Sequence, residues 1–99
     1  SHSKTPLFNA CESGNINIVK CLIENGAYLG KESKHGKTAL LIACENGHED
    51  VVKYLVEQGA NVNKNDDWFW ETPLFKACEN GDENIVRYLI EHGADINKK

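Results

Sequence analysis

Apolar residues recur along the chain in short stripes, two to each interval of 33 or 34 residues. The first stripe of an interval places them at i, i+1, i+3 and i+4, and the second at i, i+3 and i+4, so each stripe marks one face of an α-helix. The first stripes are Leu7, Phe8, Ala10 and Cys11; Leu40, Leu41, Ala43 and Cys44; and Leu74, Phe75, Ala77 and Cys78. The second stripes are Val19, Leu22 and Ile23; Val52, Leu55 and Val56; and Val86, Leu89 and Ile90. The pattern predicts three copies of a pair of short amphipathic helices.

Threonines and glycines mark where these helices should begin and end. A threonine hydroxyl can accept a hydrogen bond from an N–H of the first helical turn, and glycine adopts the left-handed conformation that ends a helix at little cost. The expected N-caps are Thr5, Thr38 and Thr72. The expected stops are Gly14, Gly47 and Gly81 after the first helix of each pair, and Gly26, Gly59 and Gly93 after the second.

The segments between pairs, residues 27–37 and 60–71, are polar and too long for a tight helix–helix turn. We expect each to form an extended, hairpin-like finger, and we call them the first and second fingers. The second is one residue longer, and Gly36, near the tip of the first, has no counterpart in its sequence NDDWFWE. The base of the first finger reads Tyr28-Leu29-Gly30 where the later ones read Asn61-Val62-Asn63 and Asp95-Ile96-Asn97, so we expect it to be less regular.

A helix pair of this size cannot bury its apolar faces alone, so neighbouring pairs must stack into a solenoid. The motifs TPLF.AC..G and IVK.LIE.GA resemble the ankyrin repeat, and the resemblance covers nearly the whole chain, from Thr5 to Asn97. It implies an all-α, ankyrin-type solenoid of stacked helix-turn-helix repeats with β-hairpin-like finger loops. The fingers and first helices would form a concave surface. We divide the single domain, 1–99, into repeats at about 5–37, 38–71 and 72–99.

The chain departs from the family pattern at the position that usually holds a histidine. Phe8, Leu41 and Phe75 stand there, so hydrophobic packing should replace the usual hydrogen bond between repeats. The resemblance also implies that finger-base asparagines can be substrates of an asparagine hydroxylase, a pattern that Asn63 and Asn97 fit loosely.

Three of the four cysteines occupy one repeated position, since 33 residues separate Cys11 from Cys44 and 34 separate Cys44 from Cys78. This spacing favours small, reduced core thiols, and a disulfide between Cys11 and Cys21 is the main alternative. The four histidines, His2, His35, His48 and His92, show no metal-ligand spacing with each other or with the cysteines. We therefore expect no zinc site and no cofactor.

Composition narrows the classes of partner. The net charge is −4 and no run of Lys or Arg exceeds two residues, which argues against nucleic acid and favours basic or neutral protein partners. No apolar stretch approaches the roughly 20 residues that span a bilayer, and residues 1–4 lack the features of a signal peptide. We expect no membrane association and an intracellular location.

The chain is not expected to be an enzyme. It contains no glycine-rich phosphate loop, no Gly-x-Ser-x-Gly elbow and no His-Glu-x-x-His motif. Its carboxylates recur with the repeat, as solvated positions do, instead of converging on one cleft. The favoured function is a protein–protein interaction module. The alternative is a self-associating scaffold segment of a longer array, because the first and last copies both keep full apolar patterns.

The second finger supplies the leading binding candidates. Trp68 and Phe69 are expected to be exposed, and an exposed aromatic cluster beside acidic residues has the composition of a binding hot spot. Trp70 is also a binding candidate, but its place close before Thr72 favours packing onto the helices, as the resemblance to the ankyrin repeat implies. The acidic residues of this cluster are Asp66, Asp67 and Glu71.

A polar column at the ends of the first helices is the second candidate, against the simpler interpretation of a solvated face. The column comprises Glu45 with Asn46 and Glu79 with Asn80, continuing from Glu12 and Ser13. Its acidic residues would favour a partner segment that carries Lys or Arg. Because the first finger carries Lys34, His35 and Lys37, we expect a basic zone beside an acidic and aromatic one.

Overall fold

The computed structural model describes residues 5–97, and this range contains six α-helices arranged as three successive pairs. They are α1 (Pro6–Ser13), α2 (Ile16–Glu24), α3 (Ala39–Glu45), α4 (Glu49–Glu57), α5 (Pro73–Asn80) and α6 (Glu83–Glu91). No residue of the described range belongs to a β-strand. None of these helices combines the length and apolar character needed to cross a bilayer. Residues 1–4, in which no signal peptide was expected, lie outside the described range.

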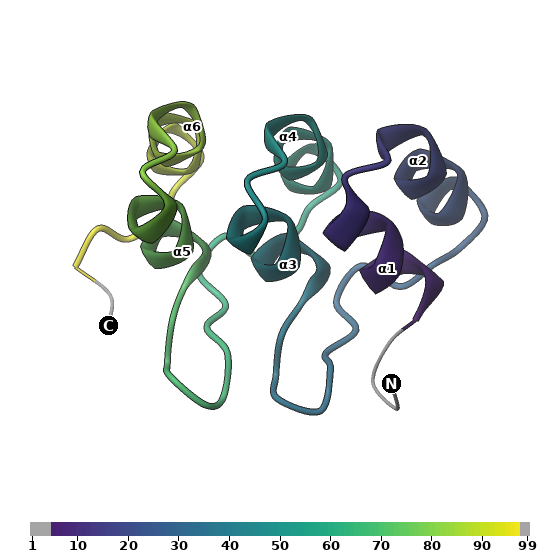
Figure 1. The fold of residues 1–99 in the computed structure, drawn as a ribbon, viewed down its shortest axis with the longest axis horizontal. Coiled ribbons are helices and arrows are strands. Elements are labelled where there is room, and N and C mark those ends of the chain that lie inside the picture. Colours follow the sequence, from purple (N-terminus) through teal and green to yellow (C-terminus); the bar gives the residue numbers. More distant parts are fainter. Residues whose placement is uncertain (1–4, 98–99) are drawn as a thin grey trace.

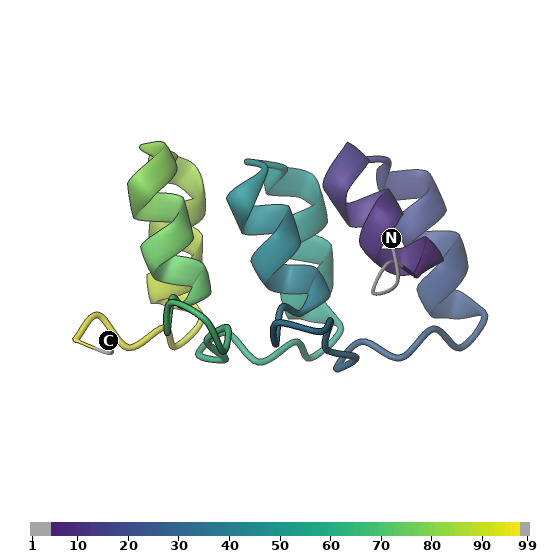
Figure 2. The same ribbon diagram turned by 60° about the horizontal axis from the view of Figure 1, so that its bottom comes forward.

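The pairs stack side by side in two layers (Figure 1). Helices α1, α3 and α5 form one layer, and α2, α4 and α6 form the other, and the main contacts between pairs join neighbouring helices of the same layer. The segments between pairs extend away from the first layer and gather along one edge of the stack (Figure 2). The molecule is therefore a short solenoid, as the spacing of the apolar stripes predicts.

The predicted helix caps are confirmed. The hydroxyls of Thr5, Thr38 and Thr72 accept hydrogen bonds from the N–H groups of Phe8, Leu41 and Phe75 at 3.2, 3.3 and 3.2 Å. All six predicted stop glycines have positive φ. Every helix thus begins or ends where a residue with the required local chemistry stands.

The core runs through the stack without a break. One cluster of buried residues includes Leu7 of the first pair, Leu40 and Leu55 of the second, and Ile85 and Leu89 of the third. The residue that stands in place of the family's histidine is buried only where another pair of helices follows. Phe8 and Leu41 are buried, whereas Phe75 is 49% exposed. Hydrophobic packing therefore replaces the histidine in two of the three copies, because no helix of the described chain covers the far side of α5.

The same edge effect corrects the prediction for the cysteines. All four are free thiols, so Cys11 and Cys21 form no disulfide. Cys11 and Cys44 are buried as expected, but the prediction that Cys78 is a core thiol is wrong, because it lies on the uncovered side of α5 and is exposed. Burial raises the pKa of Cys11 to about 12, and burial together with the charge of Asp82 raises the pKa of Cys44 to about 12.

A brief pulse of N-ethylmaleimide on the native protein should therefore modify Cys21 and Cys78 and spare Cys11 and Cys44. The thiolate is the reactive form, and burial removes both access to the sulfur and its ionisation. Peptide mass spectrometry measures the labelling of each site. All four should react once the chain is unfolded without reductant. Native labelling of Cys11 as fast as that of Cys21 would contradict this packing.

Candidate functional site

The tip of the second finger is a closed turn organised by one carboxylate. The Asp66 N–H donates to the Glu71 carbonyl at 3.0 Å, which closes the turn. Asp66 Oδ1 accepts from the N–H groups of Phe69 and Glu71 at 3.0 and 3.2 Å. Asp66 itself is fully buried. A single buried side chain therefore holds the backbone that carries the aromatic residues.

The first finger uses the same design with a serine. The Ser33 N–H donates to the Lys37 carbonyl at 2.8 Å, and Ser33 Oγ accepts from the N–H groups of His35 and Lys37 at 3.3 and 3.1 Å. Both fingers are thus hairpin-like, but each is closed by one or two backbone hydrogen bonds and a side-chain anchor rather than by a strand ladder. The extra residue of the second finger lies inside its turn, between Asp66 and Glu71.

Trp70 corrects two expectations. It stands two residues before Thr72, as Gly36 stands two residues before Thr38, and both have left-handed backbones with φ of 57° and 76°. Gly36 therefore does have a counterpart, and it is a tryptophan. The prediction that Trp70 packs onto the helices is also wrong: its side chain is 65% exposed, because it belongs to the tip turn and not to an extended lead into α5.

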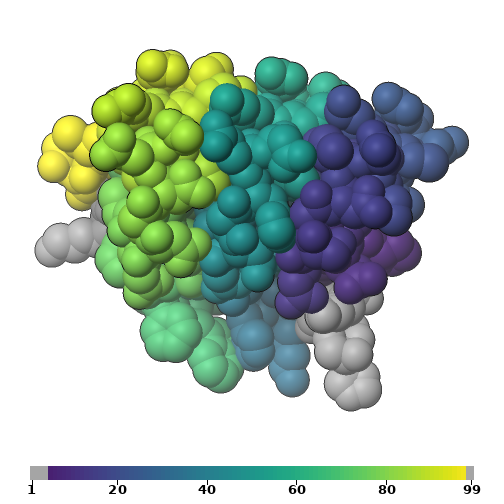
Figure 3. Space-filling view, turned by 45° about the horizontal axis from the view of Figure 1, so that its top comes forward, coloured from purple at the N-terminus to yellow at the C-terminus, as the bar shows by residue number. Residues whose placement is uncertain are grey.

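The three aromatic residues of the tip lie together in solvent. Trp68 and Phe69 are exposed to the same degree as Trp70, as predicted for these two, and their rings meet edge to face with centroids 6.1 Å apart. The fingers protrude beyond the helices (Figure 3). The aromatic cluster is therefore at the outer end of a projection, where a partner can reach it.

Contacts between the two finger tips join them into one surface. The Asp67 N–H donates to the His35 carbonyl at 2.8 Å, and the Trp68 ring lies against the His35 ring with centroids 4.2 Å apart. Gly36 has a left-handed φ of 76°, which favours glycine, and a Cβ there would also come within 2.4 Å of the Asp67 carboxylate and displace this side chain. We call the joined residues His35, Asp67, Trp68, Phe69 and Trp70 the tip platform.

A buried lysine ties the second finger to the helices. Lys76, on α5, is only 6% exposed, and its Nζ lies 2.6 Å from Glu71 Oε1, 3.2 Å from Glu45 Oε2 and 3.7 Å from Asp66 Oδ2. Burial opposes its charge, but hydrogen bonds to Glu71 and Glu45 and their negative charges outweigh burial, so the pKa of Lys76 lies above its ordinary value. Lys76 therefore stays cationic at neutral pH and neutralises the acids around it.

This cluster changes the expected charge zones. Glu45 binds Lys37 through both carboxylate oxygens, at 3.0 and 2.8 Å, as well as Lys76. Much of the predicted acidic and basic character is thus paired inside the protein, and Asp66 is not available at the surface. The sequence offered one signal for Lys76: it is the only charged residue at a position that Asn9 and Ile42 occupy in the other copies.

The amides of the polar column have structural partners. Asn80 Nδ2 donates to the carbonyls of Cys44 and Glu45 at 3.0 and 2.8 Å, which caps the end of α3 from the next pair. Asn46 Nδ2 donates to the Ile42 carbonyl at 2.8 Å. Glu79 remains exposed. Within residues 5–97, no three His, Cys, Asp or Glu side chains are grouped so that they could hold a metal ion.

Comparisons with known proteins agree on one family. A family model described as ankyrin repeats in three copies matches residues 1–66 and, in a second alignment, residues 30–99. The crystal structure of the human ASB11 ankyrin repeat domain superposes with a TM-score of 0.91 at 33% sequence identity. That match covers 97% of this chain and 43% of the ASB11 chain, so this chain spans less than half of that domain. No curated protein sequence matches the chain significantly.

The left-handed backbone of Trp70 predicts an unusual order of stabilities. Trp70→Gly and Trp70→Ala remove the same side-chain contacts, but only glycine adopts this backbone without the penalty of about 1–2 kcal/mol that a Cβ brings. We expect the glycine variant to have the higher free energy of unfolding, by about 1 kcal/mol, in urea denaturation. At Phe69, whose φ is negative, alanine should be at least as stable as glycine. Equal stabilities of the two Trp70 variants would contradict the strained turn.

Proposed function

Since this chain belongs to the ankyrin repeat family, a non-catalytic fold whose repeats generally serve as protein–protein interaction modules, we propose that it binds a partner protein through the tip platform and the adjoining first helices. The partner would lie against the concave surface that the family's fingers and first helices form. No bond chemistry is involved, and the proposed location is intracellular.

The observation that carries the proposal is the exposure of three aromatic side chains on an ordered turn. Trp68, Phe69 and Trp70 are 64–65% exposed, and large aromatic residues contribute most to binding when a partner covers them. Their backbone is already held by Asp66 and by the contact with the first finger. A partner would therefore lose little free energy to ordering this surface on binding.

The strained residue supports the same interpretation. A glycine at position 70 would suit the left-handed backbone, yet the chain places its second tryptophan there. Strain of this kind is tolerated mainly where a side chain has a role that compensates for its cost, as at binding sites. An exposed side chain makes no large contribution to the core, so partner contact is the role we propose.

Charge should have a secondary part in recognition. Glu45, Glu71 and Lys37 are already paired within the protein, whereas Asp67 and Glu79 are exposed. We propose that these two carboxylates accept a Lys or Arg of the partner beside an apolar contact with the platform. Lys34 and His35 would flank that contact on the side of the first finger.

A second candidate function is end-to-end association through the uncovered side of the third pair. Phe75 is 49% exposed there, whereas its counterparts Phe8 and Leu41 are buried by the following pair of helices. Ile90 is 46% exposed, whereas its counterparts Ile23 and Val56 are half-buried. This face repeats an interface that the solenoid already uses twice, so another helix pair of similar chemistry would fit it.

The double variant Trp68→Ala with Phe69→Ala should weaken partner binding by about 2–4 kcal/mol, a loss of roughly 30- to 1,000-fold in affinity. Isothermal titration against a partner captured by pull-down with the wild type measures the change. Ile18→Ala is the control, since it removes an exposed apolar side chain on α2, outside the platform, the first helices and the third pair, and should leave affinity unchanged. Wild-type affinity in the double variant would refute the platform as the binding site.

If the third pair mediates association, the sedimentation coefficient should rise with protein concentration, and Phe75→Glu should abolish that rise by placing a charge on the apolar face. Sedimentation velocity over a hundredfold range of concentration provides the test. A constant coefficient for the wild type would exclude this second candidate and leave the platform proposal unaffected.

A further inference from the structure

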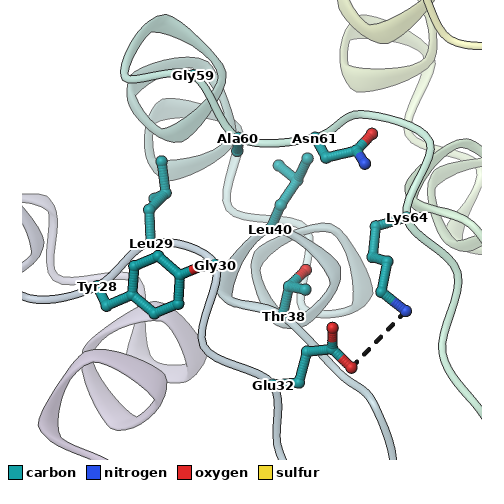
Figure 4. A pocket seen from close by; sticks show the side chains of 10 residues that line it. All are labelled: Tyr28, Leu29, Gly30, Glu32, Thr38, Leu40, Gly59, Ala60, Asn61 and Lys64. Atoms are coloured by element: carbon teal, nitrogen blue, oxygen red, sulfur yellow. Dashed lines mark ion pairs between the residues drawn. The ribbon is translucent and has the colours of Figure 1, made fainter.

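A cavity of about 420 Å³ lies at the bases of the first and second fingers, between the loops that follow α2 and α4. Figure 4 shows its lining, which includes Gly30 from the first loop, Leu40 from α3, and Gly59 and Asn61 from the second loop. The tips of the fingers take no part in it. The cavity is therefore distinct from the tip platform.

The corresponding place between the second and third pairs contains an asparagine side chain. Asn63 Nδ2 donates to the Gly93 carbonyl at 3.1 Å, and Asn63 Oδ1 accepts from the Asp95 N–H at 2.8 Å. One primary carboxamide thus satisfies both a carbonyl and an N–H of the next loop. These two bonds link neighbouring loops along the edge of the stack.

Gly30 occupies the position of Asn63 in the first copy, and Gly59 and Asn61 occupy those of Gly93 and Asp95. With no side chain at Gly30, the two backbone groups of the second loop lack the bonds that Asn63 makes in the third. Within residues 5–97, no group hydrogen-bonds to the Gly59 carbonyl or to the Asn61 N–H. The cavity therefore presents an acceptor and a donor in the arrangement that accommodates a carboxamide one interface away.

We propose that this cavity binds the side-chain carboxamide of a glutamine or asparagine from a partner protein. The carboxamide oxygen would accept from the Asn61 N–H, and its NH₂ group would donate to the Gly59 carbonyl, as Asn63 does in the next interface. Leu29, Leu40 and Ala60 supply apolar walls for the methylene groups that carry it. A protein partner is the fitting source because the family binds proteins and because the template in this structure is itself an asparagine side chain.

The same geometry discriminates against other groups. A carboxylate has no donor for the Gly59 carbonyl and would place a charge beside it, whereas an ammonium has no acceptor for the Asn61 N–H. Tyr28 borders the cavity: its hydroxyl lies 2.8 Å from where a Cβ on Gly30 would stand, yet its side chain is 73% exposed. The ring can therefore turn aside when a side chain enters.

The test titrates the ¹⁵N-labelled wild type with butanamide, a primary carboxamide on a short apolar stem, and follows its amide resonances by NMR. We expect a saturable shift of the Asn61 amide resonance and none with butanoate at the same concentrations. Gly30→Asn should abolish the response, because its own carboxamide would occupy the site, and should also raise the midpoint of thermal unfolding. A wild type without a saturable Asn61 response, or a Gly30→Asn variant that still responds, would overturn the proposal.

The Asn63→Gly variant tests the opposite change. It removes the carboxamide from the second interface, so the Asp95 amide resonance should begin to respond to butanamide while Asn61 responds as in the wild type. A folded Asn63→Gly protein whose Asp95 amide stays silent would overturn the claim that a missing side chain creates the site. The Trp68→Ala with Phe69→Ala variant should keep the butanamide response in full, so failure of this proposal and failure of the platform proposal are separable.

Discussion

The whole structure depends on burial between successive helix pairs. Each pair has an apolar face that only a neighbour can cover, and the main contacts between pairs join one pair to the next. Position in the stack therefore decides the environment of a residue as much as its type does. Cys11, Cys44 and Cys78 follow the same alanine in three copies, yet the first two are buried and the third is exposed.

This dependence explains which parts of the fold the sequence could predict. Helix positions, threonine caps and glycine stops are set by local chemistry that repeats, so their spacing was sufficient to predict them. The exposure of Phe75 and Cys78 was not predictable from the same pattern, because it depends on whether another pair covers α5. The repeated pattern predicts the same environment for each copy. The environments differ because the copies have different neighbours in the stack.

The candidate site shows a similar division. Exposure of Trp68 and Phe69 followed from a polar context, but the packing predicted for Trp70 from its closeness to Thr72 is wrong. Trp70 takes the place of Gly36 in the tip turn, and the left-handed backbone that defines this place is not encoded by residue type. The contacts of Lys76 with Asp66 and Glu45 join three different elements, and no spacing along the chain encodes such a meeting. The sequence shows that Gly30 replaces Asn63, but it does not show that Asn63 makes two hydrogen bonds to the next loop, which the loop at Gly30 lacks.

Lys76 links the stability of the second finger tip to that of the third helix pair. It belongs to α5, but its ammonium contacts the carboxylates of Asp66 and Glu71, which organise the tip of the second finger. Detachment of the third pair would therefore leave those acids without their counter-charge and loosen the tip at the same time. By thermodynamic linkage, a ligand that requires an ordered tip must also hold the third pair in place. The amide hydrogens of α5 and α6 would then exchange more slowly when a partner is bound to the platform.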